Sequence, residues 1–339
     1  DFEAWNADTY TCDYGRYIDG TLGIIRPSTG KLLKVEFEEG EDPWVILRET
    51  EEENGTYRVV AGWRPNDPTA NGREQRAKLI ITDSNGTNEE VYTLIRKNWG
   101  LPVAEINGLW WCKYNLRGNS HLFEDQVSIA QDPAQKAGQS VAEYLDNCPT
   151  EEYFAIWGDG YQGGNTTGLK LEYKNGLFQY KGYASNISQN MSALPHESHC
   201  PDGYQIPSVD DFKTILRNGA GISYNRSQTN YTSETGLQMT AVPHKRTNMH
   251  YDGGTFPELY HYELTSGGQS ITLYGPGYQP DENNGLVNNY VIYATYTGNS
   301  NDNWLIEKKT DKSEFWHVSR ANKQTRVKFC IKRPVEYIY

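Results

Sequence analysis

The side chains that could act as catalytic acids and bases are scattered along this sequence. Four carboxylates come into question: Asp159, Asp210, Asp211 and Asp281. Two such groups on loops could hydrolyse a glycosidic bond. However, the sequence has no Gly-x-Ser-x-Gly nucleophile motif, and spacing identifies no partner for its seven histidines. We therefore predict a protein that is not an enzyme, and keep a glycoside hydrolase acting on polysaccharide as an alternative from a different class.

Cysteine and histidine, the usual ligands of structural zinc, lack the spacing of a zinc site. The five cysteines include no Cys-x-x-Cys pair, and the one metal-like cluster is His196, His199 and Cys200 in a loop flanked by prolines. We expect a loop there rather than a metal site. The cysteines are either buried thiols of a reduced cytosolic protein or disulfides of an exported one, and the composition favours export.

The composition is typical of an extracellular, β-rich protein. Acidic residues outnumber basic ones by 44 to 32, which gives a formal charge of −12 and argues against nucleic acid as a partner. The 25 Tyr, 9 Trp and 9 Phe accompany many Asn, Gly, Thr and Ser, a mixture that suits sheets and carbohydrate binding. No apolar run approaches the roughly 18 residues of a transmembrane segment, and the first residues are not a signal peptide. We expect a precursor with an export signal and, in addition, a lipid-modified cysteine upstream as an anchor.

The segment CPDGYQIPSVDDFKTIL, from Cys200 to Leu216, reads as a turn followed by a helix. Ser208 and Asp211 have the spacing of a capping box, and Gly219 could end the helix in a left-handed conformation. The apolar residues recur every three or four positions: Val209, Phe212, Ile215 and Leu216. This spacing predicts a short helix with one face packed against a larger scaffold.

The same segment resembles the Cys-Pro-x-Gly-Trp-x-hydrophobic-Pro-Ser/Thr signature of FISUMP (Fibrobacter succinogenes major paralogous) domains, with Tyr204 where Trp is usual. Further runs resemble other parts of that domain in the same order: GLWWCKYNLRG (108–118), ITLYGPGYQ (271–279), NNYVIYATYT (288–297) and VKFCIKR (327–333). The resemblance covers about Glu105 to Pro334. It implies a surface domain with the α+β C-type-lectin-like fold and without an established chemistry.

The resemblance also implies a disulfide framework. Cys200 and Cys330 open and close the FISUMP-like core, and a bond between them would close a loop of 130 residues. Cys112 and Cys148 are the natural second pair. Cys12 is left over as a free thiol or an intermolecular partner.

The N-terminal part alternates short β patterns with turns. Strands are predicted at 32–40, 44–49, 55–63, 76–86 and 91–97, with a hairpin at Asn85-Gly86. Such spacing predicts a β-sandwich. The succession from Trp44 to Ile95 also resembles the BACON (Bacteroidetes-associated carbohydrate-binding often N-terminal) domain, an immunoglobulin-like spacer. We expect an all-β immunoglobulin-like sandwich as a stalk (1–97), a linker (98–104) and a lectin-like head (105–339).

Local patterns predict several elements of the head. Asp132-Pro133 should begin a helix that runs through Leu145, and residues 154–157 read as a strand. The segment GDGYQGGNTTG (158–168) should be an exposed, flexible loop, and it lacks the glycine order of a phosphate-binding motif. A hairpin is expected around Asn175-Gly176.

Ligand-binding residues are expected on loops of the head, including the polar stretches 225–234 and 244–254. Gln279-Pro280-Asp281 and Asn301-Asp302 resemble the elements with which C-type lectins hold calcium and a sugar diol. Ca²⁺ requires such oxygen ligands, so calcium is the one cofactor that the resemblance suggests. An exposed Trp that stacks on a sugar would be a binding residue, whereas a buried one would be core. The candidate set is Trp157, Tyr161, Gln279, Asp281, Asn301, Asp302 and Trp304.

These expectations describe a non-enzymatic cell-surface adhesin or fimbria-associated binding protein. Its head would recognise a glycan or a host protein through loops, and fimbrial subunits are further expected partners. The expected location is the extracellular face of the outer membrane or the medium after secretion. The alternative is a structural subunit of a pilus or envelope, which would pair by strand addition and bind no soluble ligand.

Overall fold

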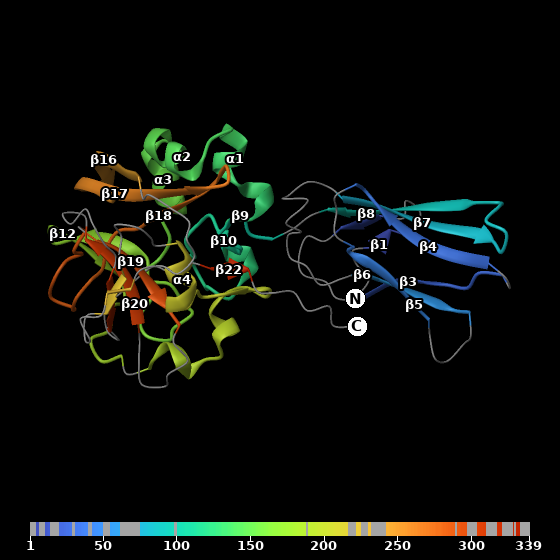
Figure 1. Cartoon of the computed structure of the whole chain (residues 1–339). Coiled ribbons are helices and arrows are strands. Elements are labelled where there is room, and N and C mark those ends of the chain that lie inside the picture. Colours follow the sequence, from blue (N-terminus) through green and yellow to red (C-terminus); the bar gives the residue numbers. More distant parts are fainter. Residues whose placement is uncertain are drawn as a thin grey trace. The chain divides into compact units, whose positions relative to one another are not determined.

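The computed structural model describes residues 5–6, 11–13, 20–28, 31–39, 43–49, 55–61, 75–97, 100–187, 189–215, 222–224, 230–231, 242–288, 290–296, 304–309, 317–320, 328 and 330–332. These parts consist mostly of β-strands with a few short helices. The chain divides into two compact units (Figure 1). The first unit contains Asp1–Pro102, Ser128–Ala130 and Pro334–Tyr339, and the second contains Val103–Val127 and Gln131–Arg333.

The described residues of the first unit form two β-sheets. Its strands are β1 (Trp5–Asn6), β2 (Thr11–Asp13), β3 (Gly20–Ile25), β4 (Lys31–Phe37), β5 (Val45–Glu49), β6 (Tyr57–Ala61), β7 (Gln75–Asp83) and β8 (Glu90–Lys97). One sheet has the order β1-β2-β8-β7-β4, and the other has the order β3-β6-β5. The five strands predicted from the sequence are β4 to β8, with small shifts at their ends.

Side-chain alternation builds the interior of the first unit. Successive side chains of a strand point to opposite faces of the sheet, and the residues of β4 accordingly alternate between partly buried and exposed. Trp44, which is fully buried and leads into β5, packs edge-on against Phe37 of β4 with 6.2 Å between the ring centroids. This contact joins the two sheets. The predicted hairpin at Asn85-Gly86 is confirmed, since β7 and β8 pair antiparallel around it and Gly86 has a φ of +73°.

The described residues of the second unit form four sheets and four short α-helices. Its strands are β9 (Val103–Ile106), β10 (Leu109–Cys112), β11 (Leu171–Lys174), β12 (Leu177–Tyr180), β13 (Tyr204–Gln205), β14 (Ile222–Tyr224), β15 (Asn230–Tyr231), β16 (Val242–Tyr251), β17 (Gly254–Ser266), β18 (Gln269–Tyr274), β19 (Tyr290–Thr295), β20 (Trp304–Lys309), β21 (His317–Arg320) and β22 (Ile331–Lys332). The helices are α1 (Pro133–Ala137), α2 (Val141–Asn147), α3 (Thr150–Ile156) and α4 (Val209–Ile215). The sheets have the orders β13-β22-β10-β9, β11-β12, β15-β14-β21-β20-β19 and β16-β17-β18. The predicted hairpin around Asn175-Gly176 is formed by β11 and β12.

One predicted helix and one predicted strand of this unit are wrong. The helix expected from Asp132 to Leu145 is broken into α1 and α2, because Gly138 ends α1 with a φ of +68° and Ser140 starts α2 through a capping box with Glu143. The strand expected at 154–157 is instead the last turn of α3 and the residue that follows it. Aromatic residues favour strands, but here the helical spacing buries Tyr153 and Ile156 on one face.

Among its described residues, the second unit has two hydrophobic clusters. One packs α4 against β9, β10, β18 and β19, and its centre is Trp111 against Phe212, with ring centroids 5.3 Å apart. The other packs α2 and α3 against β16, β17 and β18, and it includes Leu145, Trp157 and Phe256. Figure 1 shows α1, α2 and α3 gathered beside β16 and β17. The polar stretch at 244–254, expected as a loop, therefore belongs to a hairpin that carries core residues.

Helix α4 begins as the sequence predicts. The Ser208 hydroxyl accepts a hydrogen bond from the Asp211 backbone N–H at 3.1 Å, and the Asp211 carboxylate accepts one from the Ser208 N–H at 2.7 Å. Val209, Phe212 and Ile215 are buried, as expected. Leu216 and Gly219 lie outside the described residues.

Replacing Ser208 with alanine should lower the free energy of unfolding by about 1 kcal/mol, because the N-terminal N–H groups of α4 lose an acceptor. Hydrogen exchange of peptides from α4 would measure the change in the second unit. Ser208→Thr, which keeps a hydroxyl acceptor, is the control and should stay close to the wild type. Equal stability of Ser208→Ala and the wild type would contradict the capping role.

Candidate functional site

A half-open pocket in the second unit has the size and lining of a small-ligand site. Its volume is 450 Å³, within the range of pockets that hold small molecules. Four parts of the chain form it: the segment after β10, the C-terminal half of α3 with the residues after it, the start of β11, and the end of β16. The residues that line it are Arg117, Gly118, Glu124, Asp125, Phe154, Ala155, Trp157, Gly158, Asp159, Lys170, Leu171 and Tyr251.

Aromatic rings form one part of the lining. Phe154 is stacked on Trp157, with ring centroids 4.6 Å apart, and it lies 4.5 Å from the centroid of Tyr251. Phe154 and Tyr251 are partly exposed, whereas Trp157 is buried behind them. The Tyr251 hydroxyl donates a hydrogen bond to the Leu171 carbonyl oxygen at 3.2 Å. Burial, together with the nearby Asp252 carboxylate, raises the pKa of Tyr251, so this hydroxyl remains a donor.

Charged groups form another part of the lining. The Asp159 carboxylate is almost fully buried and accepts hydrogen bonds from the Lys170 ammonium at 2.8 and 3.0 Å and from the Gly118 N–H at 2.6 Å. The Arg117 guanidinium donates to the carbonyl oxygens of Asp125 at 2.7 Å and of Ala155 at 2.9 Å. Fixed donors and acceptors thus line the same pocket as the aromatic rings. Such a lining can hold a ligand that has one apolar face and several hydroxyl groups.

The segment 158–168, which contributes Asp159, is buried over much of its length, contrary to the exposed loop predicted from its glycines. Gln162 fixes it by exchanging two hydrogen bonds of 3.0 Å with the backbone N–H and C=O of Ala184. A Cβ at Gly163 would lie only 2.2 Å from the Gln189 carbonyl oxygen. These glycines therefore permit close backbone approach instead of mobility.

The aromatic residues proposed from the sequence as sugar platforms are core residues. Trp157 is 3% exposed, and Tyr161 is completely buried with its hydroxyl 3.2 Å from the Gly118 carbonyl oxygen. Stacking on a sugar requires an exposed ring, and neither position provides one. Trp157 nevertheless supports Phe154 in the pocket wall. The side chain of Trp304 lies outside the described residues.

Of the predicted calcium ligands, only Gln279 and Asp281 lie among the described residues. The Gln279 amide is buried, accepts a hydrogen bond from the Tyr180 N–H at 2.7 Å and donates one to the Asp281 carbonyl oxygen at 2.9 Å. Both polar atoms of this amide therefore form hydrogen bonds with backbone groups. The Asp281 carboxylate accepts from the side chain and N–H of Asn284 and from the N–H of Asn283, and these bonds lower its pKa. Asp281 thus caps a turn, and Asn301 and Asp302 lie outside the described residues.

One predicted disulfide is present and the other is not. Cys200 is bonded to Cys330, with 6.6 Å between the Cα atoms. Cys112 and Cys148 are separate buried thiols, so the prediction of a bond between them is wrong. Cys112 ends strand β10. Cys148 follows α2 and belongs to the hydrophobic cluster that includes Leu145 and Trp157, where its sulfur lies 3.7 Å from Arg246 Nη1. The side chain of Cys12 lies outside the described residues.

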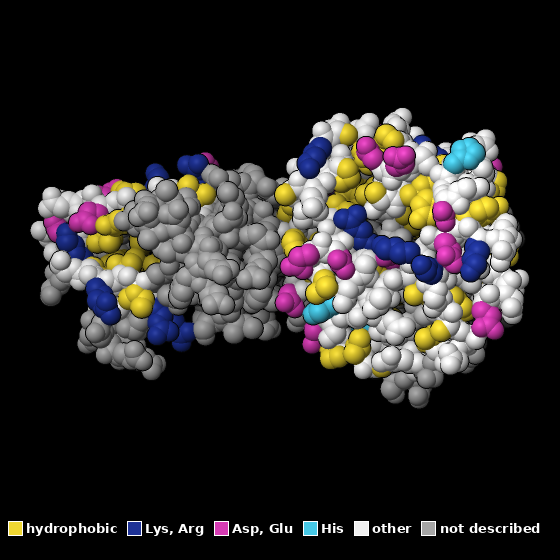
Figure 2. All heavy atoms as spheres, turned by 180° about the vertical axis from the view of Figure 1, so that it is seen from behind, with side chains coloured by type: hydrophobic (Ala, Val, Ile, Leu, Met, Phe, Trp, Pro, Cys, Tyr) yellow, Lys and Arg dark blue, Asp and Glu magenta, His cyan; other side chains and the backbone are white. Residues whose placement is uncertain are grey.

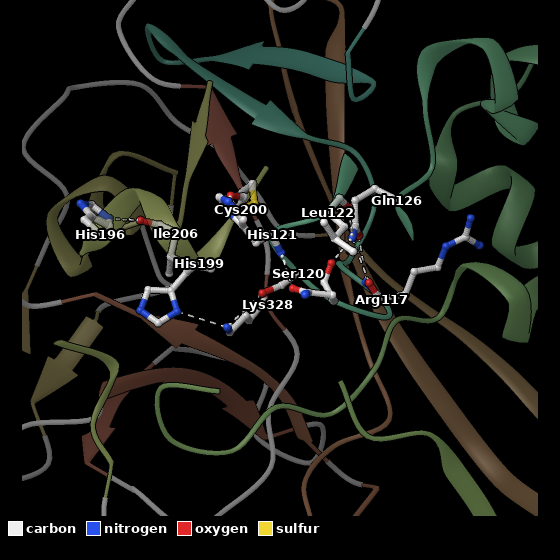
Figure 3. The surroundings of a disulfide bond; sticks show 12 residues. Arg117, Ser120, His121, Leu122, Gln126, His196, His199, Cys200, Ile206 and Lys328 are labelled. Atoms are coloured by element: carbon white, nitrogen blue, oxygen red, sulfur yellow. Dashed lines mark hydrogen bonds between the residues drawn. A yellow bond between two sulfur atoms is a disulfide. The ribbon is translucent and has the colours of Figure 1, made fainter. Parts of the chain in front are cut away.

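The Cys200–Cys330 disulfide takes the Cys200 sulfur out of the metal-like cluster with His196 and His199, and Figure 3 shows its surroundings. His196 Nε2 bonds the Ile206 carbonyl oxygen, and His199 Nε2 bonds the Met191 carbonyl oxygen at 2.7 Å. The buried Lys328 ammonium lies 3.3 Å from the other ring nitrogen of His199. Each imidazole therefore forms a hydrogen bond with a backbone carbonyl oxygen, and the cysteine sulfur is part of the disulfide.

Sequence reasoning missed most residues of the pocket. The sequence predicts a strand at Phe154 and a polar loop at Tyr251, and it gives no signal for Arg117 or Lys170. Asp159 was considered only as one scattered carboxylate. A helical assignment for residues 150–156 would have grouped Phe154 with Trp157, but no local pattern places them beside Tyr251.

Charges on the visible face of the second unit are mixed (Figure 2). A short row of Lys and Arg side chains lies near acidic ones, and hydrophobic side chains are exposed around them. Among the described residues, no helix is long and apolar enough to cross a membrane. No family model matches the sequence, and no curated protein is similar enough to it to count as a relative.

Proposed function

We propose that the second unit is the glycan-binding head of an exported surface adhesin and that the pocket beside α3 is its binding site. The observation that carries this proposal is the partly exposed aromatic pair, Phe154 and Tyr251, in a pocket that also presents Arg117 and Lys170. A pyranose has apolar C–H groups on one face and hydroxyls around its rim. The rings would stack on that face, and the charged groups would bond the hydroxyls.

This site would bind without calcium. Its aromatic and charged residues act directly on the ligand, and the Gln279 amide expected to hold calcium bonds the backbone instead. Binding to a glycan array in the presence of a chelator should therefore match binding in calcium. The rest of the proposal follows the sequence: an immunoglobulin-like first unit as a stalk, a C-type-lectin-like head, and a location at the outer face of the outer membrane or outside the cell.

Replacing Tyr251 with alanine should weaken glycan binding by about tenfold or more, because the ligand loses a stacking surface at the centre of its site. Tyr251→Phe should retain most of the affinity, since the ring remains and its hydroxyl bonds the Leu171 backbone. Binding is measured on a glycan and mucin array and then by titration with the strongest ligand.

Tyr260→Ala is the matched control. Tyr260 is also a partly buried tyrosine of this hairpin, and its hydroxyl bonds Glu258 away from the pocket. Unchanged affinity in a folded Tyr251→Ala protein, or no binding of the wild type to any glycan or mucin, would reject the proposal. In the second case a structural pilus or envelope subunit would be the better description.

Hydrolysis of polysaccharide is the second candidate function, because Glu124, Asp125 and Asp159 line the same pocket. A glycosidase needs one carboxyl group as acid and a second as base or nucleophile. Asp159 is held by Lys170 and the Gly118 N–H, and Asp125 accepts a hydrogen bond from the Asn119 N–H at 2.7 Å, which leaves Glu124 as the exposed carboxylate. Release of reducing sugar that Glu124→Gln abolishes would favour this function over simple binding.

A further inference from the structure

Two histidines and one aspartate converge where β16, β17 and the end of α2 meet, and none of them lines the pocket. His244 in β16 and His261 in β17 are directly opposite one another in the antiparallel pairing, and their rings are stacked with centroids 5.1 Å apart. Asp146 reaches both of them from the last turn of α2. Its Oδ2 is 2.8 Å from His244 Nδ1, and its Oδ1 is 3.1 Å from His261 Nε2.

His261 is the unusual member of this cluster. Its side chain is completely buried, and neither ring nitrogen has a hydrogen bond of good geometry, although the Asp146 carboxylate and the Ala142 backbone lie close to the ring. Buried polar atoms are almost always paired, because an unpaired one loses its water without compensation. Nε2 faces the Asp146 carboxylate, so its lone pair or proton points into the cluster.

We propose that Asp146, His244 and His261 bind a divalent transition-metal ion of the Zn²⁺ type. One potential ligand atom from each residue lies within 4.8 Å of the other two. Zinc bonds to nitrogen and oxygen of about 2.0–2.2 Å place tetrahedral ligand atoms roughly 3.3 Å apart. The side chains therefore need only small movements to surround an ion.

The surroundings supply the other features of a metal site. His244 Nε2 lies 3.5 Å from the Glu263 carboxylate, which can orient the imidazole when the opposite nitrogen binds metal. Arg246 Nη1 donates to the carbonyl oxygens of Leu145 at 2.8 Å and Cys148 at 2.9 Å, and so ties the end of α2, with Asp146, to β16. The Asp146 side chain is 31% exposed, which leaves an approach from solvent for the ion and for a water as a fourth ligand.

The ligand set also selects the class of ion. Two imidazole nitrogens and one carboxylate suit zinc, iron and their neighbours, whereas calcium and magnesium prefer oxygen ligands alone. The site is therefore distinct from the calcium site suggested by the lectin resemblance. It does not depend on the proposed glycan pocket.

The test is calorimetric titration of the tag-free full chain with ZnCl₂, after chelator treatment and dialysis, with metal content checked by elemental analysis. We expect one zinc ion per chain and no heat of binding from calcium at this site. His244→Gln and Asp146→Asn should each weaken zinc binding by more than about tenfold. Zinc should also raise the thermal midpoint of the wild type but not of these variants.

His250→Gln is the matched control, because His250 is exposed on the same strand and bonds Thr255 outside the cluster. Its zinc affinity should equal that of the wild type. Two results would overturn the proposal: no zinc binding by the folded wild type, which would leave an aspartate and histidine pair only, or equal binding by folded His244→Gln and Asp146→Asn.

Discussion

Replacing both Cys200 and Cys330 with alanine is expected to lower the free energy of unfolding of the second unit by about 5 kcal/mol. The bond closes a loop of 130 residues, and the unfolded chain gains conformational entropy when that loop opens. This loss is a large fraction of the free energy of unfolding of a typical domain, which is about 5–15 kcal/mol. The site should therefore be sensitive to reducing agents, although the disulfide lies outside the pocket.

The two units can unfold separately, so the measurement should report on the second alone. Hydrogen exchange of peptides from β10 and α4 does so, because both elements lie in the core cluster around Trp111. Cys112→Ala and Cys148→Ala are the matched controls. Each removes a buried sulfur without opening a loop and should cost about 1 kcal/mol.

Adding a reducing agent distinguishes the stability that comes from the disulfide bond from the stability that comes from the packing of the two sulfur atoms. It should destabilise the wild type and both control variants but leave the Cys200→Ala, Cys330→Ala double variant unchanged. If the double variant were no less stable than Cys112→Ala, the disulfide would have no structural role.

Elements that begin at a capping box or turn at an Asn-Gly pair could be predicted from the sequence. Ser208 and Asp211 lie three residues apart and form the predicted capping box, and Asn85-Gly86 makes the predicted hairpin, because both signals act within a few residues. The prediction of one continuous helix from Asp132 to Leu145 was wrong for a related reason. Ser140 and Glu143 were a second capping box inside the expected helix, and the sequence already contained it.

The candidate site could not be predicted, because its residues meet only through tertiary packing. Tyr251 is 97 positions from Phe154, and the β16–β17 hairpin places it against α3. The zinc cluster depends in the same way on a cross-strand register that pairs His244 with His261. Asp146 completes it from a helix about a hundred residues earlier. The spacing of these residues along the chain does not predict such contacts.

Replacing Gly163 with alanine is expected to lower the free energy of unfolding by about 2–4 kcal/mol, because the new Cβ must displace a backbone. Two effects contribute. A φ of +54° strains an L-residue by about 1 kcal/mol. A Cβ 2.2 Å from the Gln189 carbonyl oxygen then forces a backbone shift, and overpacking of this kind costs about 1–3 kcal/mol more.

Gly267→Ala separates these two effects. Gly267 has nearly the same φ, +56°, and a Cβ there would meet no atom within 4 Å, so this variant should lose only the strain of about 1 kcal/mol. Hydrogen exchange of the second unit measures both variants. Equal losses would mean that the segment 158–168 yields easily, as its composition predicts, and that Asp159 is not held rigidly in the pocket. A clearly larger loss for Gly163→Ala would mean that the glycines pack this segment tightly and fix the carboxylate that Lys170 and the Gly118 N–H bind.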